Sequence, residues 1–259
     1  MKSQYVLPGA IVIFGLVVAG ALFLVGNKPA DDITPGTATV RPADATDHIF
    51  GNPNASVVVI EYADLECPYC KNFHVTMHQL MDFYGPSGDV AWVFRPFPLA
   101  QLHSKAPLEA QAAECAAEQG GSEAFFKYID RVYEVTPSSN GLDLNQLPVI
   151  AEGVGLDRKA FESCMASNKF ARKVQDAYTQ AISEGATGTP HIVIMTGSSV
   201  VATLDGNQPY ASMRAAVDEI LKSLGKPVGA TSTPVTTPAP DAAGATVPAG
   251  SGVVPAPNE

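Results

Sequence analysis

The sequence predicts a mixed α/β domain with a block of helices inserted into it, preceded by one membrane-spanning helix. Apolar runs of strand length near residues 56–62 and 191–204 flank a region of helical character over about 100–186. An uncharged apolar run lies near the N-terminus. The 259 residues, 46% of them hydrophobic, suit one domain with extra terminal segments. A formal net charge of −10 argues against binding to nucleic acid, whose phosphates would be repelled.

Residues 1–26 are predicted to anchor the chain in a membrane. The 21 residues from Tyr5 to Val25 carry no charge, and as a helix they would span about 31 Å, enough for a bilayer core of about 30 Å. A cleavable signal peptide is the alternative, because Ala19-Gly20-Ala21 offers a small-residue cleavage site. The positively charged amino terminus favours the inside, so the domain is expected outside the cytoplasm, in the periplasm or at the cell surface. The polar residues 27–47 would form a tether.

The first part of the domain is predicted to run strand, helix, strand. Residues 56–62 are a continuous apolar run that is typical of a buried strand. Gly85-Pro86 ends the following helix, and residues 90–94 form the second strand. The apolar residues that recur at helical spacing in that helix are Phe73, Met77, Leu80, Met81 and Tyr84.

The helical block begins with an Ala- and Glu-rich helix over 106–119. Gly120-Gly121 would end that helix, and Ser122 can cap the next one. Asp143 and Asp157 are further candidate caps, and a last helix reaches about residue 184.

Two strands, over 191–196 and 200–204, and a helix opened by Pro209 complete a domain expected to span residues 48–225. Residues 226–259 are rich in Pro, Ala and Thr and show no apolar period, so we expect a disordered tail.

Cys67-Pro68-Tyr69-Cys70 stands where the first strand gives way to the helix. With Cys67 as the N-cap, Pro68 falls at the first helical position, where its missing N–H costs nothing. Free backbone N–H groups and the positive end of the helix dipole favour a thiolate there, lowering a cysteine pKa from about 8.5 to about 3.5–7.5. We therefore expect an exposed, nucleophilic Cys67 and a more buried, resolving Cys70 in thiol–disulfide exchange.

The other two cysteines, Cys115 and Cys164, are expected to form a structural disulfide. Four cysteines in an outward-facing chain fit two pairs, and the first pair is too closely spaced to staple a fold. A bridge across 49 positions would add about 4 kcal/mol by loop entropy. Two unpaired buried thiols are the alternative.

Two histidines follow the first cysteine pair on the same predicted helix, so zinc binding is an alternative. Cys67 and His78 would lie about 16 Å apart along a straight helix, too far to share one ion. The two thiols with His74 would form only a weak, open site. We therefore expect no metal here, and a His74 that is packed or hydrogen-bonded near the cysteines.

Several motifs together resemble the DsbA-like branch of the thioredoxin superfamily. The resemblance covers about residues 47–224 and implies a thioredoxin-like fold with an inserted helical subdomain and thiol:disulfide oxidoreductase activity. The motifs are Gly51-Asn52-Pro53, the run from Val57 to Cys70, Phe94-Arg95-Pro96-Phe97-Pro98-Leu99 followed by His103, and Gly188-Thr189-Pro190.

The resemblance also implies roles for individual residues. Thr189-Pro190 would be a cis peptide bond beside Cys67, with Thr189, Pro68 and Tyr69 contacting an extended substrate. Glu61 would be a buried acid with a raised pKa that relays a proton to or from Cys70; a Glu61 facing solvent is the alternative. Apart from the resemblance, the negative charge of Glu66 next to Cys67 would oppose thiolate formation, with a modest effect if its side chain points into water.

The function predicted is a membrane-anchored oxidoreductase that passes its disulfide to exported, unfolded proteins. By the resemblance, a membrane quinone-linked thiol oxidase would reoxidise it, and the cysteine pair makes a separate cofactor unnecessary. A reductase or isomerase is the alternative, because Pro68-Tyr69 resembles the dipeptide of glutaredoxins and DsbG-type proteins, although the short tether leaves no room for a dimerisation domain. A non-enzymatic peptide- or metal-binding module is disfavoured by the intact Cys67 and Cys70.

Overall fold

The computed structural model describes residues 39–228. The predicted anchor, most of the predicted tether and most of the predicted tail lie outside the described residues. In the part that is described, no helix is both long and apolar enough to cross a membrane. The elements, in chain order, are β1 (His48–Gly51), β2 (Val57–Ala63), α2 (Pro68–Tyr84), the 3₁₀ turn η1 (Gly85–Ser87), β3 (Val90–Pro96), α3 (Ala106–Val135), the 3₁₀ turn η2 (Leu144–Gln146), α4 (Leu147–Gly153), α5 (Arg158–Ser167), α6 (Ala171–Ser183), β4 (His191–Thr196), β5 (Ser199–Asp205) and α7 (Tyr210–Ser223).

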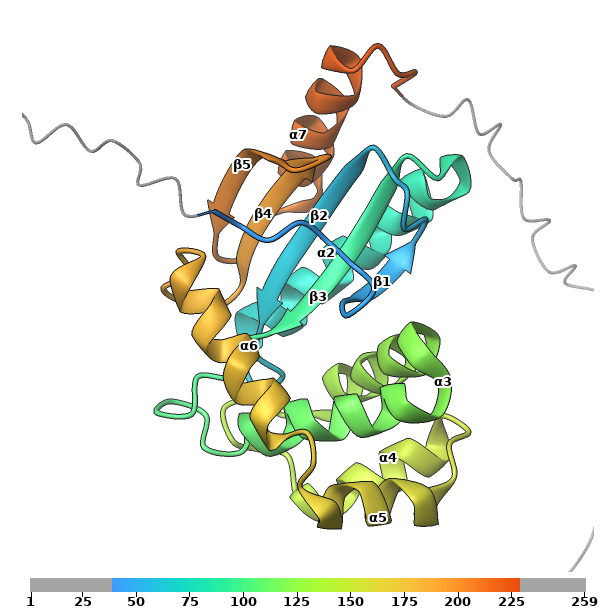
Figure 1. The fold of residues 1–259 in the computed structure, drawn as a ribbon, viewed down its shortest axis with the longest axis vertical. Helices are drawn as coiled ribbons and strands as arrows, with labels where there is room; N and C mark the ends of the chain where they lie inside the picture. The colour runs from blue at the N-terminus through green and yellow to red at the C-terminus, as the bar shows by residue number, and fades with distance from the viewer. Residues whose placement is uncertain (1–38, 229–259) are drawn as a thin grey trace, which may run out of the picture.

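The strands form one twisted sheet in the order β1-β3-β2-β4-β5 (Figure 1). Strands β2 and β3 are parallel, with α2 as the crossover between them, while β1, β4 and β5 run antiparallel to their neighbours. The four strands predicted from the apolar runs are confirmed to within two residues at each end. Strand β1 was not predicted.

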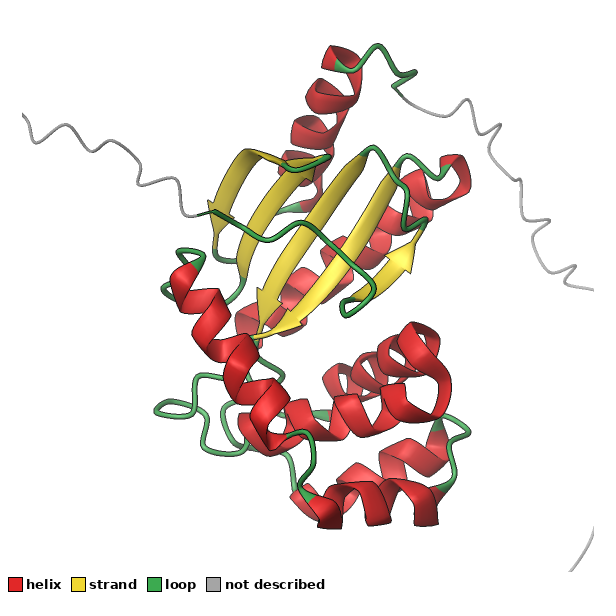
Figure 2. Cartoon of the chain, viewed as in Figure 1, coloured by secondary structure: helices red, strands yellow, loops and turns green. Residues whose placement is uncertain are grey.

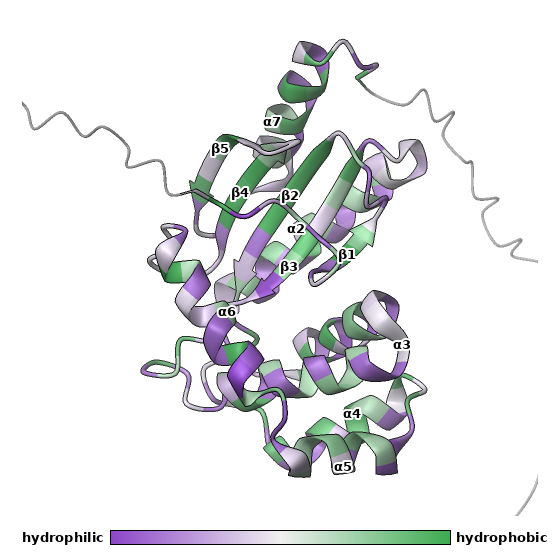
Figure 3. Ribbon diagram, viewed as in Figure 1, coloured by the Kyte–Doolittle hydropathy of each residue, from purple (hydrophilic) through white to green (hydrophobic). Residues whose placement is uncertain are grey.

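Helices contact both faces of the sheet: in Figure 2, α2 and α7 lie behind it, and α6 lies at one end of the opposite face. Helices α2 and α7 bury one face, where Trp92, Phe73 and Met213 belong to the main core. Helix α6 lies over the other face, where Ile60, Val93 and Ala181 form a second core. Because successive residues of a strand point to opposite faces, a strand buried on both sides must be apolar throughout. This accounts for the apolar residues concentrated on the central strands in Figure 3.

The helical block lies between β3 and β4, as predicted, and comprises α3 to α6. The residues of α3 are helical except at Gly120 and Gly121, where the chain bends; Gly121 has φ of 63°, a conformation that favours glycine. Ser122 does not cap a new helix after this bend. Its hydroxyl oxygen instead accepts a hydrogen bond from the Ile49 backbone N–H of β1, at 3.2 Å.

The predicted bridge between Cys115 and Cys164 is present, with Cα atoms 5.8 Å apart. It ties α3 to α5 inside the helical block. Asp143 and Asp157 cap η2 and α5 as predicted, because each carboxylate accepts a backbone N–H of the turn that follows. The block therefore carries its own covalent and capping constraints.

Residues 39–47 belong to the folded domain, so the predicted boundary at residue 48 is wrong. Val40 is 5% exposed and packs into the second core beside Ala181. The polar composition of this segment suggested a solvated tether. Its polar side chains are instead used in buried pairs that the sequence pattern does not reveal.

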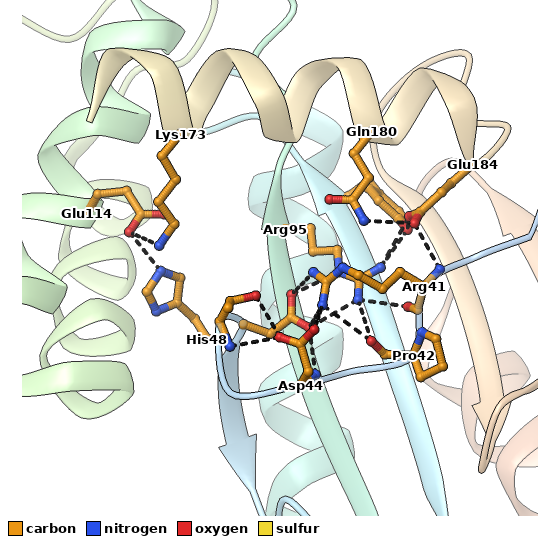
Figure 4. Close-up of polar contacts among 12 residues, drawn as sticks. Arg41, Pro42, Asp44, His48, Arg95, Glu114, Lys173, Gln180 and Glu184 are labelled. Carbon is orange, nitrogen blue, oxygen red and sulfur yellow. Dashed lines mark hydrogen bonds and ion pairs between the residues drawn. The ribbon is translucent and has the colours of Figure 1, made fainter. Parts of the chain in front are cut away.

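Arg95 of β3 is the centre of those buried pairs (Figure 4). Its Nε and Nη2 atoms donate to the Asp47 carboxylate, each at 3.0 Å, and its Nη1 atom donates to Glu184 at 3.2 Å and to the Tyr62 hydroxyl at 2.9 Å. Arg41 adds a second guanidinium to Asp47 at 2.8 Å. Although burial alone would raise it, hydrogen bonds from the two arginines hold the pKa of Asp47 below its usual value.

Candidate active site

Cys67 is the N-cap of α2, as predicted from Pro68. Its backbone is extended (φ −80°, ψ 122°), and Pro68 occupies the first turn of the helix. The turn is closed by a hydrogen bond from Lys71 N–H to the Cys67 carbonyl at 3.0 Å. The sulfur of Cys67 therefore lies at the end of α2 where backbone N–H groups have no helical partner.

The two thiols are free and differ from the prediction in their exposure. Cys70 is fully buried, as expected, but Cys67 is only 5% exposed, so the expectation of an openly exposed nucleophile is wrong. Tyr69 is 63% exposed and stands at the surface between them. A partner must approach Cys67 along the surface formed by Tyr69 and the neighbouring loops.

The electrostatics distinguish the two sulfurs. A hydrogen bond from the Cys70 thiol is the largest influence on Cys67, and with further donors from Thr189 and the Cys70 and Tyr69 backbone it outweighs burial and lowers the pKa of Cys67 to about 6. Burial and the adjacent Cys67 sulfur raise the pKa of Cys70 well above its usual value. At neutral pH the pair therefore holds one thiolate, at Cys67, and one thiol.

Thr189-Pro190 is a cis peptide bond, as the resemblance implied. It precedes β4, whose antiparallel pairing of His191 with Tyr62 brings the loop to the end of β2 next to α2. The Cys67 sulfur lies 3.5 Å from the Thr189 carbonyl oxygen. The Thr189 hydroxyl has no other partner among the described residues, so it can donate to the Cys67 thiolate, and this contact lowers the pKa of Cys67. The substrate contacts assigned to Thr189, Pro68 and Tyr69 stay predictions.

Glu61 of β2 is fully buried, so the alternative of a solvent-facing side chain is wrong. Burial raises the pKa of Glu61 to about 8. A hydrogen bond from Trp92 Nε1 to Oε2, at 3.0 Å, acts in the opposite direction but is the smaller effect. Oε1 has no partner within residues 39–228. The charge of Glu61 adds to the raised pKa of Cys70, and the charge of Cys67 adds to the raised pKa of Glu61. The proton relay between Glu61 and Cys70 stays a prediction.

The Glu66 side chain does not point into water. It is fully buried, and its carboxylate accepts backbone N–H groups of Asn140, Gly141 and Leu142 at 2.6, 3.3 and 3.4 Å. These donors converge because the loop after α3 turns through three successive residues with positive φ, from Ser138 to Asn140. The negative charge beside Cys67 is thus held in place by the helical block.

A second buried acid, missed by the sequence analysis, lies against Glu66. Burial, followed by the neighbouring Glu66 carboxylate, raises the pKa of Glu109 to about 9, so Glu109 is protonated at neutral pH. Neither of its carboxyl oxygens has a hydrogen-bond partner among the described residues. Asp64, in the segment between β2 and α2, accepts hydrogen bonds from Leu99 N–H at 2.8 Å and from His103 Nδ1 at 3.0 Å. A sequence signal for Glu109 exists, because it shares the alanine-rich buried face of α3.

His74 is hydrogen-bonded near the cysteines, as expected. Its Nε2 atom lies 2.7 Å from Asp130 Oδ1, and His78 joins the same oxygen at 2.9 Å. Among the described residues, this trio is the one group whose ligand atoms converge closely enough to hold a metal ion, and it excludes both thiols. The zinc site weighed from Cys67, Cys70 and His74 is therefore not formed.

An apolar groove of about 380 Å³ opens at the same end of the sheet. Leu99 and Leu102 from the loop after β3 line one part, and Tyr178 and Thr187 line another. Leu102 is 69% exposed, and its carbonyl is held by the side chain of Asn140. The backbone N–H of Asn140 also donates to Glu66, the residue before Cys67. Asn140 therefore links the groove to the loop that carries Cys67.

This fold and its paired thiols define a redox protein of thioredoxin-like architecture. A family model described as thioredoxin matches residues 43–219. The chain therefore belongs to the thioredoxin family, and its structural neighbours make it a DsbA-like member.

Solved DsbA structures are similar to the chain over most of their own length. DsbA2 of Pseudomonas aeruginosa is 28% identical with a TM-score of 0.57, covering 71% of this chain and 99% of that one. Alpha-DsbA1 of Wolbachia pipientis is 24% identical with a TM-score of 0.63, covering 72% and 96%. Oxidised BdbD of Bacillus subtilis is 19% identical with a TM-score of 0.62, covering 71% and 97%. The last two likenesses show the fold alone.

The curated relatives carry a different name. The Na(+)/H(+) antiporter NhaA 1 of Mycobacterium sp. (strain KMS) is 29% identical over 167 residues, which are 63% of this chain and 26% of that protein. NhaA 3 of Salinispora tropica is 34% identical over 144 residues, 56% and 21% respectively. The chain spans about a quarter of the length of the curated relatives it matches. Their antiporter name describes those whole proteins.

Proposed function

We propose that this chain is a thiol:disulfide oxidoreductase that oxidises thiols of exported, unfolded proteins. The observation that carries the proposal is the asymmetry of the cysteine pair: a Cys67 with a pKa of about 6 beside the cis Thr189-Pro190 loop, and a buried Cys70 that keeps its proton. A protein that only binds peptides has no need for this asymmetry.

The reaction begins with the Cys67–Cys70 disulfide. A substrate thiolate attacks the Cys67 sulfur, a mixed disulfide forms, and the Cys70 sulfur leaves and takes a proton, for which Glu61 is the proposed source. A second substrate thiolate then attacks the mixed disulfide and displaces the Cys67 thiolate. The substrate loses two electrons and gains one disulfide, and the enzyme pair gains both electrons.

The low pKa of Cys67 has the sign required of an oxidant. A stabilised thiolate lowers the free energy of the reduced enzyme relative to the disulfide form. A pKa of about 6 stabilises the reduced state at pH 7 by about 1 kcal/mol after allowance for solvent screening, which is about 20 mV.

The apolar groove beside the site is proposed to receive the substrate. Leu102 and Tyr69 are both largely exposed at this end of the molecule, and unfolded chains present apolar side chains that such a surface can bury. Residues 1–26 are proposed to anchor the enzyme in the membrane with the domain extracytoplasmic. A membrane quinone-linked thiol oxidase is the proposed reoxidising partner.

A redox titration against glutathione tests the direction of electron flow. An oxidant is expected to have a potential above about −200 mV, whereas a value near about −270 mV, typical of thioredoxin, would refute the oxidase role. Cys67→Ala should abolish oxidative refolding of a reduced test protein, with Cys115→Ala/Cys164→Ala as the matched control in which two cysteines are removed away from the site. Faster rescue of a scrambled protein than of a reduced one would instead favour an isomerase.

A further inference from the structure

Three side chains from two helices direct ligand atoms at one point away from the cysteine pair. His74 and His78 are four residues apart and so lie on the same face of α2, and Asp130 projects from the part of α3 that follows its bend. The two Nε2 atoms are 3.2 Å apart, and they lie 2.7 and 2.9 Å from Asp130 Oδ1. None of these residues has a role in the disulfide chemistry.

The triangle has nearly the size that a bound metal ion requires. Zinc bonds to histidine nitrogen and carboxylate oxygen are about 2.0–2.2 Å long, which places neighbouring ligands of a tetrahedral site about 3.3 Å apart. The two Nε2 atoms, 3.2 Å apart, match that separation, while Asp130 Oδ1 lies closer to them than it requires, at 2.7 and 2.9 Å. An ion at the centre would need the Asp130 carboxylate to move outward by about half an ångström, away from both imidazoles.

Hydrogen bonds to Asp130 from both imidazoles leave the two Nε2 atoms without a hydrogen bond to each other. If both imidazoles donate from Nε2, two N–H groups meet at a single carboxylate oxygen while their nitrogens stay 3.2 Å apart. A neutral imidazole offers one donor and one lone pair, and a cation can use both Nε2 lone pairs and the carboxylate together.

The ligands are held in place, and one side of the site is open. The His74 side chain is 6% exposed and its ring packs against the rings of Trp92 and Tyr133, with centroids 5.1 and 4.7 Å away. The side chains of His78 and Asp130 are 33% and 38% exposed. This leaves room for water to complete the coordination, as in zinc sites with three protein ligands.

We propose that His74, His78 and Asp130 bind one divalent transition-metal ion, with Zn²⁺ the best match to two imidazoles and a carboxylate. From the sequence, the zinc site considered combined His74 with the thiols of Cys67 and Cys70. The fold instead supplies the third ligand from the inserted helical block, so the site is a product of the insertion and binds its ion without the redox pair.

The test is calorimetric titration of tag-free protein with Zn²⁺, in a Cys67→Ala/Cys70→Ala background that removes the thiols but keeps the Cys115–Cys164 bridge. One ion should bind per chain. His78→Ala and Asp130→Asn should each weaken binding by about 100-fold or more, since loss of even an outer-shell group costs about 10–100-fold. Asp82→Asn is the matched control, because it removes an exposed charge near His78 without removing a ligand.

Trp92 supplies a second, independent measurement. It is the only tryptophan of the chain, and its ring lies 5.1 and 5.4 Å from those of His74 and His78. Co²⁺ should quench its fluorescence and develop visible absorption, both displaced by Zn²⁺. Equal affinity for Zn²⁺ in the parent and the His78→Ala and Asp130→Asn variants, or an equal loss in Asp82→Asn, would overturn the proposal.

Discussion

Replacing Cys70 by alanine tests the source of the reactivity of Cys67. The Cys70 thiol is the largest influence that holds the pKa of Cys67 at about 6. A hydrogen bond to a charged acceptor contributes about 1.5–3 kcal/mol, and one pH unit corresponds to about 1.4 kcal/mol. The pKa of Cys67 should therefore rise by about one to two pH units in Cys70→Ala, and less in Cys70→Ser, which keeps a donor at the same place.

The measurement is thiolate absorbance near 240 nm against pH, in protein kept reduced. The rate of alkylation by iodoacetamide should follow the same curve. A midpoint that stays near pH 6 in Cys70→Ala, or that moves equally in the alanine and serine variants, would show that the helix end and Thr189 set the pKa without the neighbouring thiol.

The same ionisation predicts how the stability of the reduced enzyme depends on pH. The pKa of Cys67 is lower in the folded state than in the unfolded chain, so the thiolate stabilises the fold fully above about pH 9 and loses this contribution as the pH falls through about 6. At pH 7 the contribution is about 1 kcal/mol. Cys67→Ala should flatten this part of the profile in urea denaturation.

Three further predictions concern residues away from the nucleophile. The pKa of Glu61 is raised to about 8, so this carboxyl by itself lowers the stability of the fold by about 3 kcal/mol as the pH rises from 5 to 8, and Glu61→Gln in the disulfide form should remove most of that contribution in urea denaturation. Removing the Cys115–Cys164 bridge, which closes a 49-residue separation, should lower the free energy of unfolding by at most about 4 kcal/mol in a guanidinium titration. Asp47→Asn leaves the buried Arg95 guanidinium without its main partner and should cost about 3–5 kcal/mol by the same measurement.

Each of these three predictions has an outcome that would contradict it. An unchanged pH profile in Glu61→Gln would mean that the carboxyl is solvated. An unfolding midpoint insensitive to the loss of the bridge would mean that the helical block is held by its core alone. Asp44→Asn, at an exposed residue beside the same arginine pair, is the matched control for Asp47→Asn and should have a much smaller effect.

Local chemistry made the nucleophile predictable. Pro68 can occupy only the first turn of a helix without loss of a hydrogen bond, so it fixes Cys67 as the N-cap and directs free N–H groups to its sulfur. The continuous apolar run of β2 required burial on both faces, and that is why a carboxyl within it, Glu61, is buried. These predictions depend on neighbours a few residues away.

Features that depend on distant partners were not predictable in this way. Strand β1 has four residues and is specified by its pairing with β3. Glu66 resembles a surface acid until the loop after α3, more than 70 residues further on, supplies its donors. Asp47 and Arg95 likewise resemble solvated charges, and the fold alone brings them together.

The loop that holds Glu66 has a consequence for engineering. Asn140, Gly141 and Leu142 belong to the helical insertion, yet they hydrogen-bond a side chain next to the nucleophile. Trimming the chain to a minimal sheet-and-helix scaffold would remove the three N–H donors of the Glu66 carboxylate and leave its charge unfixed beside the reactive sulfur. A design that moves the Cys67–Cys70 site into another protein should therefore keep the helical block together with the sheet and α2.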